Sequence, residues 1–226
     1  MTKGFKILGT GTFVPPNVVT NSELEPFVEN YDPDKGAGSL DYWIRTHYGI
    51  QERRWSDELP SYQAIQACKA ALDAANLSIE EVDLLILNTA FGDMQQPTTA
   101  TEIQKGLGMK PDSFAMELNS PCAGSVFGMI TAMHFLNSGN HQKALVVGVD
   151  KMTELINKKD FRMAGLFGEG AGACVLEAGM RNETNVHYHL GSKGEEGVPE
   201  QFSLRVLGGK ARFPHSRCKD QDHHFY

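Results

Sequence analysis

The sequence has few cysteines, and no two of them have the spacing of a metal site. The four lie far apart in 226 residues without a C-x-x-C motif; they are Cys68, Cys122, Cys174 and Cys218. This distribution argues against a zinc site and against the disulfide framework of a small secreted domain. We therefore expect four free thiols and no bound metal.

Positive charge and long apolar runs are also scarce. The chain carries 21 lysines and arginines against 28 aspartates and glutamates, a net charge of −7, and its basic residues are scattered. Nucleic-acid binding needs clustered positive charge to neutralise phosphates. No apolar run approaches the roughly 18–20 residues that span a bilayer, and the N-terminus lacks the pattern of a signal peptide. These absences predict a cytoplasmic protein that binds neither nucleic acid nor membrane.

What the sequence does contain is an alternation of short apolar segments and helical patterns. Strands are expected over residues 6–11, 82–89, 113–118, 143–149, 165–177 and 185–197. Helices are expected over residues 40–50, 61–75, 98–107 and 123–137, and a short helix capped by Asn21 is expected to run through Phe27. The order strand, helix, strand predicts an α/β domain with a mixed, mostly parallel sheet and helices outside it.

Cys122 is the residue best placed for chemistry. It stands in the segment NSPCAGSVFGM, between an expected strand and a helix that opens with small residues. Unpaired amides and the positive end of the helix dipole favour a thiolate there, and the amide of Cys122 can stabilise the oxygen of a bound thioester. The alternative is a small core residue, as most unpaired cysteines are. For Cys68, in an apolar helix stripe, and Cys174, inside a strand, we expect that alternative.

Other motifs favour structural roles or leave two interpretations open. Residues 168–172, GEGAG, lack the spacing of a phosphate-binding loop, so close strand packing is expected. His187 and His189 face the same side of an expected strand but lack a third metal ligand nearby. Two interpretations remain open for Trp43 and for the arginines at 53–54. In the first, Trp43 lies at the edge of the core and the arginines lie on a solvated surface. In the second, Trp43 stacks on the adenine of a nucleotide and the arginines bind its phosphates.

Five segments, in order over residues 7–178, together resemble the β-ketoacyl-ACP synthase III family of thiolase-like condensing enzymes. They are ILGTGTFVPPNVVTNSEL, DYWIRTHYGIQERRW, NSPCAGSVFGM, KALVVGVDKMT and LFGEGAGACVLEA. The third is similar to the family's CAGF nucleophile segment, and the fifth to its FGDGAGA-x-VL strand. The resemblance implies a thiolase-like fold and a homodimer. It also implies that residues 1–178 form the half that carries the nucleophile, and that residues 179–226 begin a second, pseudo-symmetric half that is largely absent from this chain.

The resemblance also implies a two-step reaction that initiates fatty acid or polyketide synthesis. Cys122 would take an acyl group from acyl-CoA, and the acyl-enzyme would condense with malonyl-ACP after decarboxylation. Coenzyme A enters as a thioester substrate, and no separate cofactor is expected. Trp43 falls on the family's tryptophan that stacks against the CoA adenine.

The sequence departs from the family pattern in three ways. The decarboxylating His and Asn, and a second oxyanion glycine, belong to the family's C-terminal half, which this chain does not reach before Tyr226. His47 stands where the family has an arginine, and Arg45 lies two positions earlier on another helix face. Gln96 precedes Pro97 where the family has a large apolar residue lining the partner subunit's acyl pocket. A longer or more polar acyl chain is therefore expected.

Two other functions fit the same residues. One is an acyltransferase of the same superfamily that passes the acyl group from Cys122 to an alcohol or amine. The other is a non-catalytic dimer partner or degenerate remnant, which would show no turnover. We expect condensation to fail in this chain alone if the family's C-terminal half is what stabilises the enolate.

Overall fold

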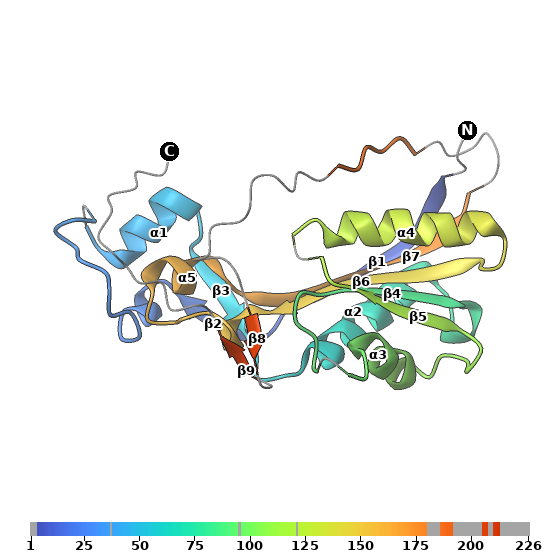
Figure 1. The fold of residues 1–226 in the computed structure, drawn as a ribbon. Coiled ribbons are helices and arrows are strands. Elements are labelled where there is room, and N and C mark those ends of the chain that lie inside the picture. The colour runs from blue at the N-terminus through green and yellow to red at the C-terminus, as the bar shows by residue number, and fades with distance from the viewer. Residues whose placement is uncertain are drawn as a thin grey trace. The chain divides into compact units, whose positions relative to one another are not determined.

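A five-stranded mixed sheet forms the centre of the larger of two units in the computed structural model of the chain (Figure 1). The structure describes residues 4–36, 38–94, 96–120, 122–179, 186–191, 205–207 and 210–212. The first unit covers residues 1–186 and the second covers residues 187–226. The described part of the second unit contains a short antiparallel pair, β8 (Arg205–Leu207) with β9 (Lys210–Arg212).

The sheet has the strand order β1-β7-β6-β4-β5. Its strands are β1 (Phe5–Phe13), β4 (Leu84–Asn88), β5 (Phe114–Leu118), β6 (Lys143–Lys151) and β7 (Glu169–Ala178). β4 pairs in parallel with both β5 and β6, whereas β7 pairs antiparallel with β6 and β1. The expected mixed α/β sheet is confirmed, but parallel pairing makes up half of its ladders and not most of them.

Helices cover both faces of this sheet, as expected (Figure 1). One face carries α4 (Gly124–Ser138), and the other carries α2 (Pro60–Ala75) and α3 (Thr99–Leu107). α2 begins with a proline at its first position, whose missing N–H costs nothing there, and ends at Asn76 in the left-handed conformation. Gly108 and Gly139, in the same left-handed conformation, end α3 and α4.

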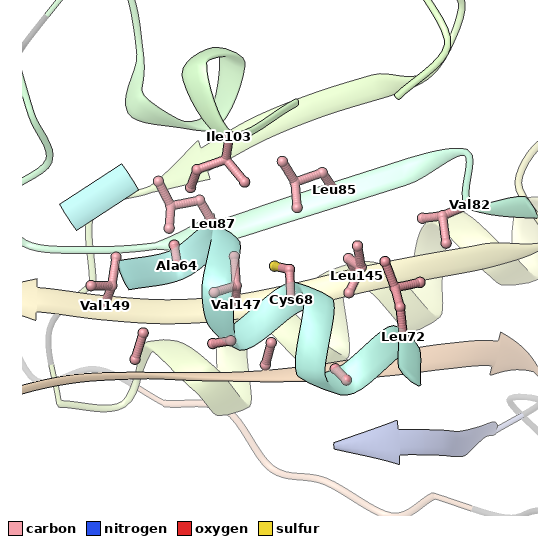
Figure 2. Packing of buried hydrophobic residues seen from close by; sticks show 14 of the residues in the cluster. Ala64, Cys68, Leu72, Val82, Leu85, Leu87, Ile103, Leu145, Val147 and Val149 are labelled. Carbon is pink, nitrogen blue, oxygen red and sulfur yellow. The ribbon is translucent and has the colours of Figure 1, made fainter. Parts of the chain in front are cut away.

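The largest apolar cluster lies between α2, α3 and the sheet (Figure 2). β4 is buried along its whole length, as expected for the continuous apolar run LLIL in a strand covered on both faces. Leu85, Leu87 and Leu145 point into this cluster and are fully buried. Each such leucine stabilises the fold by about 1.5–3 kcal/mol relative to an exposed one. Cys68 of α2 lies among them, so its expected core role is confirmed.

β1 approaches α2 closely because two of its residues are glycines. A Cβ atom on Gly9 would lie 2.5 Å from the amide nitrogen of Ala75 and 2.6 Å from the carbonyl oxygen of Ala71. A Cβ on Gly11 would overlap the backbone of Ala67 and Ala71. The segment GTG therefore serves backbone contact between strand and helix.

A second group of elements lies at one end of the sheet (Figure 1). It contains the hairpin of β2 (Asn17–Thr20) with β3 (Glu52–Trp55), and the helices α1 (Leu40–Tyr48) and α5 (Phe161–Leu166). Its apolar residues form a cluster of their own around Leu24, Leu40 and Ile44. α1 is capped by the hydroxyl of Ser39, which accepts from the amide of Tyr42 at 3.2 Å.

Three local expectations are wrong. Only a 3-10 turn, η1 (Ser22–Leu24), follows Asn21, whose side chain makes no cap and is used elsewhere. The strand expected over residues 165–177 begins only at Glu169, as β7, because residues 165–166 belong to the end of α5. Residues 186–191, the described part of the strand expected over 185–197, have no regular structure, and the rest of that range lies outside the described residues. Beyond these, the short 3-10 turns η2 (Ile79–Glu81) and η3 (Met152–Glu154) flank β4 and β6.

Within the described residues, no helix has the length and apolar character needed to cross a membrane. The same residues hold no group of three or more His, Cys, Asp or Glu side chains arranged to bind a metal.

Candidate active site

Cys122 lies in the short connection between β5 and α4 and is exposed. The carboxyl ends of β4, β5 and β6 lie at the same edge of the sheet because these strands are parallel. In open α/β sheets, ligands bind at this edge. The first helical hydrogen bond of α4 runs from the amide of Phe127 to the carbonyl of Ala123, at 3.1 Å. The amides that precede it at the start of α4, directly after Cys122 in the chain, have no partner inside the helix.

Two glycines one turn apart seat α4 on the sheet. A Cβ on Gly128 would lie 2.9 Å from Cγ1 of Val146, and a Cβ on Gly124 would overlap the side-chain amide of Asn88. A larger residue at either position would lift the helix and move the turn that carries Cys122. The segment CAGSVFG thus has a packing reason for its small residues.

Cys122 borders a cavity of about 310 Å³. Its lining is polar and rich in glycine: Asn88, Cys122, Ser125, Gly148, Val149, Asp150, Gly168, Gly170 and Gly172. These residues come from β4, from the start of α4, and from the adjoining ends of β6 and β7. The glycines of the expected GEGAG strand therefore border the cavity next to the cysteine.

Asp150 fixes the backbone on one side of the cavity. Its Oδ1 accepts from the amide of Ala90 at 2.7 Å and from the hydroxyl of Thr89 at 3.3 Å. Burial raises the pKa of Asp150, and these hydrogen bonds act in the opposite direction. The carboxyl group thus ties the end of β6 to the loop that leaves β4.

Sequence reasoning singled out Cys122 but not Asn88 and Asp150, which line the same cavity. Both stand at the carboxyl end of an apolar strand, Asn88 after LLIL and Asp150 after LVVGV. A polar residue that ends an apolar strand at this edge was the available signal. Gln96 is exposed and is not among the cavity-lining residues.

Trp43 does not line this cavity; it lies on α1 in the second apolar cluster. Its indole is half-buried and stacks on the imidazole of His47, with ring centroids 4.2 Å apart and 16° between the planes. Tyr48 and Phe161 meet it edge-on at 5.2 Å and 4.7 Å. Nδ1 of His47 donates to the carbonyl of Trp43 at 2.8 Å, which holds the imidazole in place.

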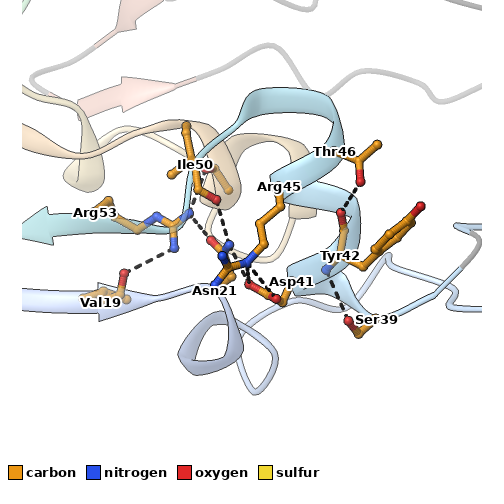
Figure 3. Close-up of polar contacts among 10 residues, drawn as sticks. Val19, Asn21, Ser39, Asp41, Tyr42, Arg45, Thr46, Ile50 and Arg53 are labelled. Atoms are coloured by element: carbon orange, nitrogen blue, oxygen red, sulfur yellow. Dashed lines mark hydrogen bonds and ion pairs between the residues drawn. The ribbon is translucent and has the colours of Figure 1, made fainter.

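Arg45 and Arg53 are both engaged within the chain (Figure 3). Arg53 is buried and donates to the carbonyls of Val19 and Gly165 and to Oδ1 of Asn21. Arg53 is therefore a buried structural residue, whereas the two open interpretations placed it on a solvated surface or in contact with a phosphate. Nε of Arg45 donates to both carboxylate oxygens of Asp41, at 2.8 and 2.9 Å.

Asn21 joins these two arginines into one network. Its amide donates to Asp41 at 2.9 Å and to the carbonyl of Ile50 at 2.8 Å, while its oxygen accepts from Arg53 (Figure 3). The hydrogen bonds from Arg45 and Asn21 lower the pKa of Asp41. The predicted cap is thus a buried link between β3 and α1.

Comparison with known proteins decides the family. The profile of the 3-oxoacyl-[acyl-carrier-protein (ACP)] synthase III family matches residues 116–194. A β-ketoacyl-[acyl-carrier-protein] synthase III from Bacillus cereus is 40% identical over 193 residues, which are 84% of this chain and 59% of that protein. The chain belongs to the β-ketoacyl-ACP synthase III family.

Solved structures of β-ketoacyl-ACP synthase III proteins share the fold. The chain is similar to the enzyme from Aquifex aeolicus, with a TM-score of 0.71, 39% identity, and coverage of 80% of this chain and 55% of that one. It is also similar to the priming β-ketosynthase of the R1128 polyketide pathway, with a TM-score of 0.70, 28% identity, and coverage of 78% and 51%. The chain thus spans little more than half the length of the relatives it matches.

Proposed function

We propose that Cys122 is the nucleophile of a condensing enzyme and takes an acyl group from acyl-CoA. The observation that carries the proposal is an exposed cysteine at the start of α4, beside a cavity of about 310 Å³, in a chain of this family. A thiolate there attacks the thioester carbonyl and forms a new carbon–sulfur bond. The bond to CoA breaks, and CoA leaves as its thiol after taking a proton.

The chemistry of the first step fits the start of α4. Negative charge develops on the thioester oxygen during the attack, and unpartnered amides at a helix N-terminus stabilise such charge. We propose that the amide of Cys122 is one of the donors. The small residue Ala123 that follows is exposed and leaves room for the substrate carbonyl.

In the second step, malonyl-ACP would lose CO₂ and its enolate carbon would attack the acyl group on Cys122. The carbon–carbon bond forms, and the Cys122 thiolate leaves. This step uses the His and Asn that the resemblance places in the family's C-terminal half. The pathway, fatty acid or polyketide initiation, is part of the same proposal.

Coenzyme A would bind through its adenine at Trp43. The support is the stacked pair of Trp43 and His47, since His47 is exposed and extends the aromatic surface. We also propose a homodimer. β5 is the edge strand of the described sheet, and an edge with unpaired amides and carbonyls is a template for a second copy.

Intact-protein mass spectrometry tests the first step. The natively purified chain is incubated with acetyl-, butyryl- and octanoyl-CoA, with Cys122→Ala in parallel. One acyl adduct on the parent and none on Cys122→Ala is expected. If no thioester labels the parent, the proposal fails. Release of CO₂ from malonyl-ACP then separates condensation from an acyltransferase, which would form an ester or amide without it.

A further inference from the structure

Asn88 is a polar residue in a place where an apolar one is expected. It ends β4, whose preceding residues 84–87 are fully buried leucines and isoleucine. Its own exposed fraction is 4%. Among the described residues, its Oδ1 is buried without a hydrogen-bond partner. Such a group is costly, so packing alone does not account for an amide here.

The amide of Asn88 occupies the space beneath the first turn of α4. A Cβ on Gly124 would overlap all three terminal atoms of Asn88, so the flat amide lies against the glycine Cα. The next residue, Ser125, lies over the neighbouring strand, where its hydroxyl is 3.2 Å from the position of a Cβ on Gly148. Gly148 is the ladder partner of Asn88. The first turn of α4 therefore rests across the ends of β4 and β6.

The backbone beneath that turn is fixed on both sides. β4 pairs with β5 at Leu118 and with β6 at Gly148. Asn88 and Cys122 border the same cavity. At its first turn, the height of α4 above the sheet is thus set by the side chain of Asn88, and this turn directly follows Cys122 and Ala123 in the chain.

We propose that Asn88 is a positioning residue for Cys122 and acts through the backbone of Gly124. The inference rests on the proposed role of Cys122 as nucleophile. The side-chain amide of Asn88 is thin enough to lie under a glycine and large enough to support the first turn of α4. Removing the amide leaves a gap beneath the helix, and adding a methyl group to Gly124 pushes the helix away. Each change moves the α4 amides relative to the thiolate.

The two changes should compensate each other. In the double variant Asn88→Ala, Gly124→Ala, the new methyl group occupies the space that the amide has left. Coupling between residues in contact is read from such a cycle of single and double variants. Two residues that affect Cys122 independently would show no rescue.

The test uses the 226-residue chain with Cys218→Ser, so that Cys122 is the accessible thiol of interest. The rate of Cys122 alkylation by iodoacetamide is followed by intact mass from pH 5 to pH 10. Each single variant should slow labelling at pH 7 by up to about tenfold, because helix amides that have moved away from the thiolate stabilise it less. The double variant should return to within about threefold of the parent.

Asn140→Ala is the matched control, because Asn140 is exposed just beyond the other end of α4. Circular dichroism confirms that each variant is folded, and Asn88→Ser replaces Asn88→Ala if the latter is not. The proposal is overturned if Cys122 is alkylated as fast in Asn88→Ala as in Asn140→Ala. It is also overturned if the fold-loss in rate of the double variant equals the product of the fold-losses of the two single variants.

The acylation rate is measured on the same proteins with butyryl-CoA. In the single variants the maximal rate should fall while the half-saturating concentration stays the same. If the parent takes no acyl group, the proposed function fails, and the alkylation cycle still decides the role of Asn88.

Discussion

The imidazole of His47 stacks on the indole of Trp43, one turn earlier on α1. The histidine is fixed by its hydrogen bond to the Trp43 carbonyl, so the two rings form one flat, two-layer platform. The family resemblance places an arginine at the position of His47. Here an imidazole stands in place of a guanidinium, and the arginine of the same helix, Arg45, is paired with Asp41.

The first prediction concerns this platform and CoA. Trp43→Ala should raise the dissociation constant of CoA by about tenfold or more, because stacking of a base on an aromatic ring is worth about 1–3 kcal/mol. Isothermal titration calorimetry measures it. Pantetheine lacks the adenine and is the control ligand, so its affinity should be unchanged. An equal loss for CoA and pantetheine would contradict an adenine site at Trp43.

A second prediction follows from the burial of the cysteines. Burial raises the pKa of Cys174 to about 11, and it raises the pKa of Cys68 further. Neither thiol should react with iodoacetamide at pH 8 in the folded protein, whereas the exposed Cys122 should. Peptide mapping of the Cys218→Ser protein reports all three. Labelling of Cys68 or Cys174 before Cys122 would be inconsistent with this structure.

Much of the fold could be predicted because the apolar periodicities were strong. The continuous run in β4 and the stripe of α2 set the two central elements, and their burial agrees. The β2–β3 hairpin was missed because its strands have only four residues each. β2 (NVVT) follows two prolines, and β3 (ERRW) consists mostly of charged residues. Asn21 was assigned to a cap from its local sequence, but contacts with Asp41, Ile50 and Arg53 decide its role.

The site could be predicted only in part for a similar reason. Cys122 has a local signal in the small residues around it. Asn88 and Asp150 are brought to it by strand order, since β4 lies between β5 and β6 in space but precedes both in sequence. No sequence periodicity shows that neighbourhood.

The third prediction concerns Asp150 and pH. Because burial places the pKa of Asp150 in the folded protein above its usual value of 3.8, the folded state holds this proton more tightly than the unfolded chain. The contribution of Asp150 to the free energy of unfolding therefore falls as the pH rises from about 3.8 to the folded-state value. Asp150→Asn removes that decline. Urea unfolding from pH 3.5 to pH 7 measures the difference between the two proteins.

The exposed Asp112 provides the control for this experiment, as Asp112→Asn. The gain of Asp150→Asn over the parent should grow with pH across the window, while the Asp112→Asn difference should not follow that curve. A gain that shrinks with rising pH would have the wrong sign for a carboxyl destabilised by burial.

The fourth prediction tests the contact between β1 and α2. Gly11→Ala should lower the free energy of unfolding by about 1–3 kcal/mol or more, because the added methyl group meets the backbone of α2 and not a movable side chain. Gly172→Ala on β7 is the matched control, since a Cβ there meets nothing within 4 Å. Urea unfolding compares them. Equal losses would mean that strand propensity, and not the helix contact, governs both positions.

The pairing of β1 with β7 also has a consequence for how the chain is made. Phe5 pairs with Ala178, so β1 leaves the ribosome before the other strands of the described sheet, and its partner β7 leaves after them. At about 5–20 residues per second, β1 spends roughly 10–35 s without its partner. During that time its backbone can already rest on α2, which is complete at Ala75. Gly9 and Gly11 thus allow β1 to pack on α2 during synthesis, before its hydrogen-bonding partner β7 has been made.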